Sequence, residues 1–227
     1  PPNLVLVRAK SGSMTADFGG ATRWDTLVQV VADVTTTYEN VVKFGAKWYP
    51  TAEKCENQTQ FDCTSYHPVF GDCQSFIANG AACDVDPGFD SNQLKPDLNN
   101  SMSIVNALPV AADIDGYCWT PSQQGFEESL AALKAEVPDP TEDRAIMLIT
   151  DGLISDGSLG PRECVDGNLN NYTPTDVHTE LVSAIAAAYT NDGIPTYVVG
   201  IDAASGFDAE ARECAAAGGV PNPATRD

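Results

Sequence analysis

The fold is decided by the opening run Asn3-Leu4-Val5-Leu6-Val7-Arg8-Ala9-Lys10-Ser11-Gly12-Ser13-Met14. Four consecutive apolar residues, Leu4 to Val7, are typical of a strand buried on both faces, as in a parallel sheet covered by helices on either side. The strand leads into a loop in which Ser11 and Ser13 flank a glycine, so both hydroxyls can turn toward one point. Because open α/β sheets bind ligands at the carboxyl ends of their strands, we expect function at this loop first.

Apolar strands alternate with amphipathic helices along the rest of the chain, which predicts an α/β fold with a doubly wound, mostly parallel sheet and helices on both faces. After a loop at 14–21, Thr22 is expected to cap the first helix, and Asn99 or Ser101 a later one. The spacing of apolar residues predicts strands at 42–48, 82–85, 145–150 and 194–201, and helices at 23–40, 101–108, 122–137, 175–190 and 207–217.

Length and composition indicate a single domain with an insertion at about 50–85. The chain has 227 residues, of which 43% are hydrophobic, enough to bury a sizeable core. No apolar run approaches the roughly 18 residues that a membrane helix needs. No signal peptide is visible, so we expect a mature or excised segment.

The charge of the chain is strongly negative. There are 32 acidic and 12 basic residues, which give a formal net charge of −20. A nucleic-acid partner is not expected, because phosphate binding requires a basic surface. The acidic surface fits either cation-rich surroundings or solubility alone.

Seven cysteines indicate an oxidising compartment. They lie at positions 55, 63, 73, 83, 118, 164 and 214, and none forms the Cys-x-x-Cys pair that is usual at a zinc site. We therefore expect disulfides within the insertion, together with a pair between Cys118 and Cys164 that would join two loops. The odd number leaves at least one thiol without a partner inside this segment.

Three motifs resemble the von Willebrand factor A (vWA) domain family, over most of the chain except 50 to about 98. The run Ala9-Lys10-Ser11-Gly12-Ser13-Met14 is similar to the Asp-x-Ser-x-Ser motif of the metal-ion-dependent adhesion site, in a form common in bacteria, with Ala9 where the family has Asp. The run Trp119-Thr120-Pro121 resembles the middle motif, whose threonine completes the site. Thr150-Asp151-Gly152, which follows an apolar strand, resembles the motif that supplies the second acid.

The resemblance implies a secreted or cell-surface adhesion module that is not an enzyme. Its metal ligands would be Ser11, Ser13, Thr120 and Asp151, holding Mg²⁺, or Mn²⁺ or Ca²⁺, which prefer such oxygen donors. A protein or surface partner would complete the ion's shell with a carboxylate, and we expect Trp119 and Asp156 at this contact.

The residue Ala9 weakens the metal site that the resemblance implies. Loss of an outer-shell partner typically lowers metal affinity about 10–100-fold. We expect the ion to bind weakly or to be absent, unless Asp115 or Asp156 compensates. The family also continues with a further strand and helix that this sequence lacks, so the chain is either truncated or part of a longer protein.

Three alternatives stay open. The chain could be a metal-independent structural or assembly scaffold whose metal site has lapsed. The acidic run 84–90 could bind Ca²⁺, although solvated loop carboxylates are the commoner case. A secreted hydrolase would require one of the two histidines, His67 or His178, close to Ser11 or Ser13.

Overall fold

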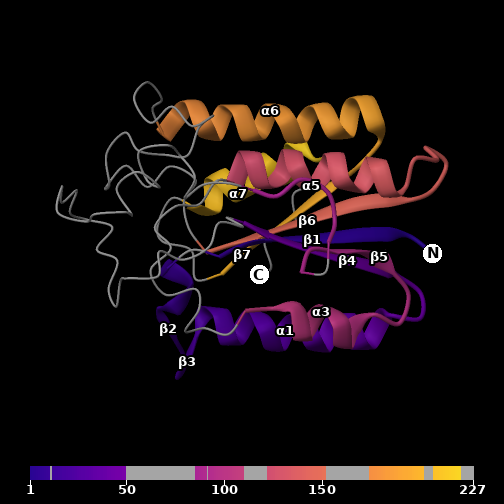
Figure 1. Cartoon of the computed structure of the whole chain (residues 1–227). Helices are drawn as coiled ribbons and strands as arrows, with labels where there is room; N and C mark the ends of the chain where they lie inside the picture. The colour runs from indigo at the N-terminus through magenta and orange to yellow at the C-terminus, as the bar shows by residue number, and fades with distance from the viewer. Residues whose placement is uncertain are drawn as a thin grey trace, which may run out of the picture.

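A five-stranded sheet separates two layers of helices (Figure 1). The computed structural model describes residues 1–10, 12–49, 85–90, 92–109, 122–151, 174–201 and 207–220. No helix among these residues has both the length and the apolar character needed to cross a membrane. The insertion predicted at 50–85 and six of the seven cysteines lie outside the described residues, so the expected disulfides stay predictions.

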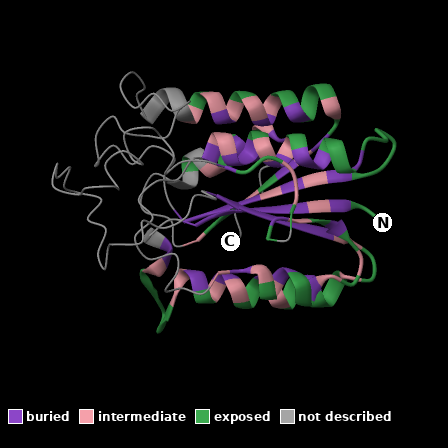
Figure 2. Ribbon diagram, in the orientation of Figure 1, coloured by how far each residue is buried: buried purple, intermediate pink, exposed green. Residues whose placement is uncertain are grey.

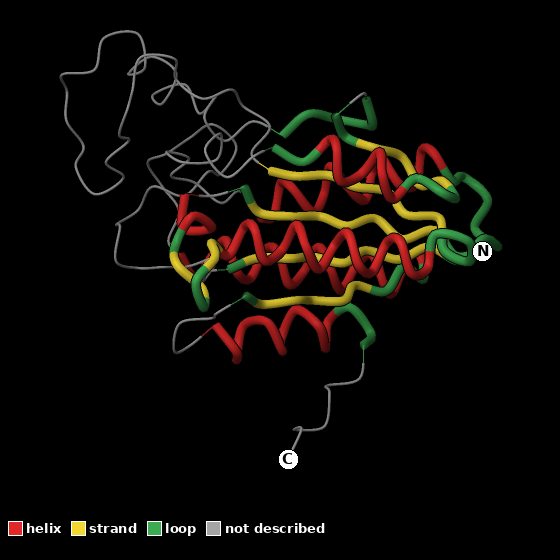
Figure 3. Tube along the Cα trace, turned by 90° about the horizontal axis from the view of Figure 1, so that it is seen from below, coloured by secondary structure: helices red, strands yellow, loops and turns green. Residues whose placement is uncertain are grey.

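The sheet is mostly parallel, as predicted. Its strands are β1 (Asn3–Ala9), β4 (Lys43–Tyr49), β5 (Leu94–Asp97), β6 (Arg144–Thr150) and β7 (Thr196–Gly200). Their order is β5-β4-β1-β6-β7, and β5 alone runs antiparallel to its neighbour. Figure 3 shows the strands side by side, with the four parallel ones ending along the same edge. We call this edge the carboxyl edge.

Helices cover the two faces of the sheet unequally. On one face lie α1 (Arg23–Tyr38) and α3 (Ser101–Ala107), and on the other α5 (Ser122–Glu136), α6 (Pro174–Asp192) and α7 (Phe207–Ala217) (Figure 1). These helices confirm the five that the sequence predicts. We refer to the two faces as the α1 face and the α5 face.

Alternate residues of each strand build one core on each face. Strand side chains point to opposite faces in turn, so neighbouring residues of β1 enter different clusters. The cluster on the α1 face includes Leu6, Met14, Trp24, Leu27, Phe44, Trp48, Ile104 and Ile149. The cluster on the α5 face includes Val5, Val7, Ala9, Tyr49, Phe126, Leu133, Ile146, Leu148 and Ile185. Figure 2 shows the buried strands between the two helical layers.

The loop expected at 14–21 contains regular structure. A 3₁₀ turn spans Gly12–Thr15, and a small hairpin joins β2 (Asp17–Phe18) to β3 (Ala21–Thr22). Gly19 and Gly20, with φ angles of 69° and 98°, form the turn between these strands, a conformation that glycine adopts without strain. The hairpin leads directly into α1. Thr22 caps this helix as predicted, since its Oγ1 accepts a hydrogen bond from the backbone N of Asp25 at 2.9 Å.

The predicted cap of α3 was wrong. The N-cap of α3 is Asn100, not Asn99 or Ser101. The side chain of Asn100 donates to the carbonyl of Phe44, and the carboxylate of Glu39 accepts from the backbone N of Ser101 at 3.1 Å. The carboxylate of Glu39 therefore accepts the hydrogen bond from the start of α3 that a capping side chain would otherwise accept.

One edge strand of the sheet was not predicted. Of the strand predicted at 82–85, Val85 alone is described and belongs to no strand, and the rest lies outside the described residues. The strand next to β4 at this edge is β5, which contains Pro96. Proline cannot donate to a ladder and is tolerated at sheet edges, so its presence hid this strand from the sequence pattern.

Candidate binding site at the carboxyl edge

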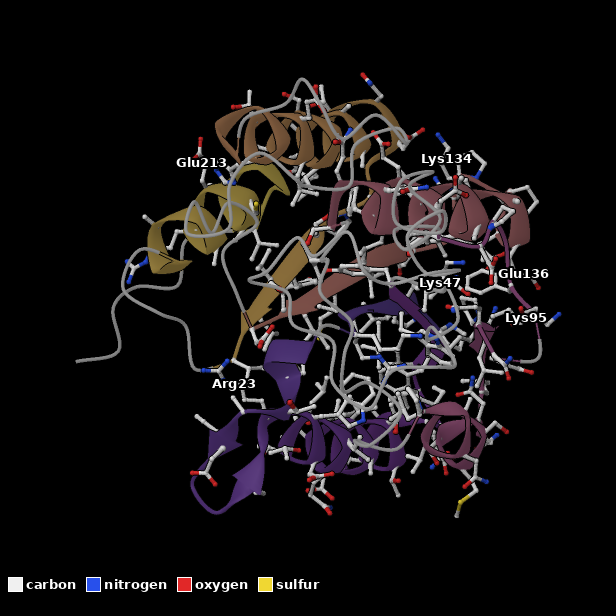
Figure 4. All side chains as sticks on the ribbon, turned by 60° about the vertical axis from the view of Figure 1, so that its left-hand side comes forward. Arg23, Lys47, Lys95, Lys134, Glu136 and Glu213 are labelled. Carbon is white, nitrogen blue, oxygen red and sulfur yellow. The ribbon has the colours of Figure 1, made fainter. Side chains whose placement is uncertain are left out.

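The carboxylate of Asp151 lies at the carboxyl end of the central strand β6. It is buried, with 1% of its side chain exposed, and its Oδ2 accepts a hydrogen bond from Nη1 of Arg23 at 3.1 Å. Arg23 is the first residue of α1, and 18% of its side chain is exposed. Figure 4 shows Arg23 projecting from the start of this helix. The single acid of the predicted site that the structure describes is thus already matched by a cation of the same chain.

A second arginine lies deeper on the same face. Arg8 pairs with Trp48 on one neighbouring strand and with Ile149 on the other, and both of these residues belong to the cluster on the α1 face. Asp151 follows Ile149 by two positions, so its side chain lies on the α1 face as well. Arg8 and Asp151 are therefore successive polar groups under the carboxyl edge.

The guanidinium of Arg8 is fully buried and lacks hydrogen-bond partners. Its relative exposure is 0%, and Nε, Nη1 and Nη2 find no partner among the described residues. Its carbon Cζ lies 6.0 Å from the centroid of the Trp48 ring, at the outer limit of a cation–π contact. Burial lowers the pKa of Arg8 from its ordinary value to about 9. A charged group in this position has no compensation from the described part of the chain.

Ala9 occupies the opposite face. It is fully buried in the cluster that also holds Tyr49 and Phe126, and it pairs with Tyr49 across the β1–β4 ladder. The hydroxyl of Tyr49 lies 3.2 Å from Oγ of Ser122. Burial raises the pKa of Tyr49, and the hydrogen bond with Ser122 acts in the other direction. An apolar residue suits this position, whereas the vWA motif would place a carboxylate there.

Among the residues predicted to hold a metal, Asp151 is the one whose side chain the structure describes. Ser13 is described by its backbone alone, in the 3₁₀ turn at Gly12–Thr15. Ser11 and Thr120 lie outside the described residues, as do the predicted partner contacts Trp119 and Asp156 and the possible substitute Asp115. Their convergence on one point therefore stays a prediction.

The described residues do not by themselves fit a divalent ion. No group of three or more histidines, cysteines or acids suited to a metal occurs among them. At the carboxyl edge they supply one carboxylate, which Arg23 neutralises, and an alanine where a second acid would stand. A cation entering here would have to compete with the guanidinium of Arg23.

The described part of the acidic run, 85–90, lies next to a buried lysine. On the α5 face, the buried ammonium of Lys47 donates to the carbonyls of Asp86, at 3.0 Å, and Gly88. The carboxylate of Asp90 accepts from the backbone N of Asn92 and of Gln93, both at 2.6 Å. Burial lowers the pKa of Lys47, while nearby carboxylates, Glu128 first, raise it. The two carbonyls thus accept hydrogen bonds from an ammonium, and the carboxylate of Asp90 accepts hydrogen bonds from the backbone.

The structure describes no catalytic group that contains a histidine. Nε2 of His178 lies 3.0 Å from the carboxylate of Glu213, between α6 and α7. His67, like Ser11, lies outside the described residues, so the hydrolase alternative stays untested.

Neither Arg8 nor Arg23 was predicted from the sequence to be a site residue. A cation at the first position of a helix opposes the helix dipole, so Arg23 signals a tertiary partner. Arg8 interrupts an apolar run that forms a central strand, where a charged residue is rarely buried without one.

No protein-family model matches the chain, and no curated protein or solved structure matches it either.

Proposed function

We propose that this chain is a non-catalytic adhesion or ligand-binding module of the vWA type, on a doubly wound sheet. It contacts a protein or surface partner at the carboxyl edge, in a secreted or cell-surface protein. The observation that carries the proposal is the buried carboxylate of Asp151 at the end of a central parallel strand, where such sheets bind their ligands. The serine loop that follows the neighbouring strand β1 supports it from the sequence.

A divalent ion, Mg²⁺, Mn²⁺ or Ca²⁺, contributes weakly to this proposed site. The ligands would be Ser11, Ser13, Thr120 and Asp151, all hard oxygen donors. Ala9 removes one negative charge, and Arg23 already pairs with the remaining acid. Both features lower the affinity for a cation.

A metal-independent scaffold is the second candidate, and one specific observation favours it. The ion pair between Arg23 and Asp151 satisfies the carboxylate within the chain. A site that supplies its own cation keeps its shape without metal, and contacts with partners would then depend on other surfaces.

Calorimetric titration with Mg²⁺, Mn²⁺ and Ca²⁺ separates the two candidates. The chain is compared with Ala9→Asp, and Ala9→Asp/Asp151→Asn serves as the matched control. The binding-module proposal expects Ala9→Asp to bind roughly 10–100-fold more tightly than the parent, and the control to lose this gain. If none of the three proteins binds any ion, the metal-linked proposal is wrong and the scaffold remains.

A further inference from the structure

Among the described residues, the α1 face of the carboxyl edge carries a buried arginine that no carboxylate contacts, in a chain whose net charge is −20. Arg23 and Asp151 cancel one another through their ion pair. Arg8 lies on the same face, and the structure describes no carboxylate within hydrogen-bond distance of it. The guanidinium of Arg8 is therefore a buried positive charge that no described carboxylate contacts, in surroundings that include Trp48 and Ile149.

This charge is costly unless something binds it. Moving an ion out of water is unfavourable even after the surrounding protein relaxes. Natural proteins satisfy the great majority of buried polar atoms, and three unsatisfied nitrogens on one side chain mark an exception that calls for a partner. No described residue supplies that partner, and the candidate we develop is an external anion.

We infer that Arg8 is the receptor for a carboxylate, which it binds directly and without a metal ion. The inference rests on the proposed function in one respect: it places the ligand at the same edge of the sheet. A planar carboxylate can take two parallel hydrogen bonds from a guanidinium. Its single charge balances that of Arg8, whereas a phosphate would bring nearly two negative charges close to Asp151.

The site thus reverses the electrostatics of the motif that the sequence resembles. There, acids hold a cation, and the cation accepts the partner's carboxylate. Here an alanine stands, on the opposite face, where that motif has an acid; Arg23 pairs with the acid Asp151, and Arg8 supplies a buried positive charge. The ligand class, an acidic side chain or a chain terminus of a protein partner, stays the same while the metal becomes unnecessary.

The test uses the whole chain and a small probe, because the guanidinium is not exposed and the probe must enter by a local opening. Thermal unfolding is measured after long incubation in sodium chloride, with chloride replaced stepwise by acetate at constant pH and ionic strength. We expect the Tm of the parent to rise by roughly 3 °C or more at about ten times the Kd for acetate. Arg8→Met should show no such rise, and the matched control Lys43→Met, at a partly exposed cation, should behave as the parent does.

A second measurement keeps the inference testable if Arg8→Met does not fold. In the parent, the Nε–H resonance of Arg8 is followed by NMR during the same titration, and a saturable shift is expected. The inference is wrong if acetate shifts neither the Tm nor this resonance, or if Arg8→Met responds as the parent does. An equal or larger response to inorganic phosphate would also contradict it, since the site is then not selective for a carboxylate.

The two proposals fail in different experiments. If Ala9→Asp does not bind divalent ions, the metal-linked function is wrong, and the acetate response of the parent is not affected by that result. Loss of the acetate response would defeat the role of Arg8 and leave the ion titration untouched.

Discussion

Nη1 of Arg23 lies 3.1 Å from Oδ2 of Asp151, so the first residue of α1 pairs with the carboxylate that directly follows the central strand β6. The pair joins the helical layer to the carboxyl edge. It also occupies the one described carboxylate that the predicted metal site offers. Both consequences can be tested with the same substitution.

Arg23→Gln should lower the free energy of unfolding by about 2 kcal/mol. The substitution leaves the buried carboxylate of Asp151 without its cation, and the expected loss is smaller than for a fully buried pair because Arg23 is partly exposed. Chemical denaturation measures it. The control is Lys43→Gln, which breaks a more exposed pair with Glu142 (3.3 Å) and should cost at most about 1 kcal/mol. Equal losses in the two variants would show that the buried pair stabilises the fold no more than the exposed pair does.

Arg8→Met should raise the free energy of unfolding near neutral pH by roughly 1–4 kcal/mol in the absence of carboxylate ligands. It replaces a buried unpaired charge with an apolar side chain of similar length. Urea unfolding in chloride buffer measures the change. A destabilised Arg8→Met would mean that the guanidinium has a stabilising partner.

The advantage of Arg8→Met should shrink as the pH rises above about 9. Burial lowers the pKa of Arg8 to about 9 in the folded state, whereas the pKa of the unfolded side chain keeps its ordinary, higher value. Between these values the unfolded chain binds more protons than the folded one, so the stability of the parent rises with pH relative to the variant. The expected slope is about 1.4 kcal/mol per pH unit. Tyr49 is present in both proteins, so its titration cancels. A constant difference up to about pH 10.5 would contradict the lowered pKa.

Gly125→Ala should destabilise the chain, although alanine is the better helix former. A Cβ at this position of α5 would lie 2.5 Å from Cγ and Cδ1 of Tyr49, which is packed against the helix. Overpacking of this kind costs about 1–3 kcal/mol, against a gain in helix propensity of about 1 kcal/mol. Calorimetric unfolding of the single variants and of Gly125→Ala/Tyr49→Ala completes a double-mutant cycle. Additive losses would show that the two residues do not clash.

Lys47→Met should cost about 1–3 kcal/mol, because the carbonyls of Asp86 and Gly88 then lose their donor. Urea unfolding is the measurement. Lys95→Met is the control: its exposed ion pair with Glu136 (2.9 Å) lies at the surface, and little change is expected (Figure 4). A Lys47→Met variant as stable as the parent would mean that the loop carbonyls turn to solvent.

The parts of the fold that local signals control could be predicted from the sequence. The apolar run at Leu4 to Val7 marked a central parallel strand, and Thr22 marked the start of α1 through a cap that closes within three residues. Such features depend on neighbours along the chain, so the pattern contains them.

Features that depend on residues far apart in the sequence were missed, because a local sequence pattern does not contain them. The cap of α3 uses Glu39, 62 positions away from Ser101. The same holds for the candidate site. Arg23 and Asp151 are 128 positions apart, so no local sequence motif predicts that they pair. The sequence predicted a site at the carboxyl edge, which stays a prediction, but it did not indicate that Arg23 pairs with Asp151 there.

Mn²⁺ broadening of backbone amide resonances in Ala9→Asp tests the central claim most directly, since a paramagnetic ion marks its own location. The account predicts that substoichiometric Mn²⁺ first broadens the amides of residue 9, Arg23, Thr150 and Asp151, and that adding Asp151→Asn abolishes this pattern. Broadening spread over the acidic surface, or a pattern that persists with Asp151→Asn, would contradict a binding site at the carboxyl edge.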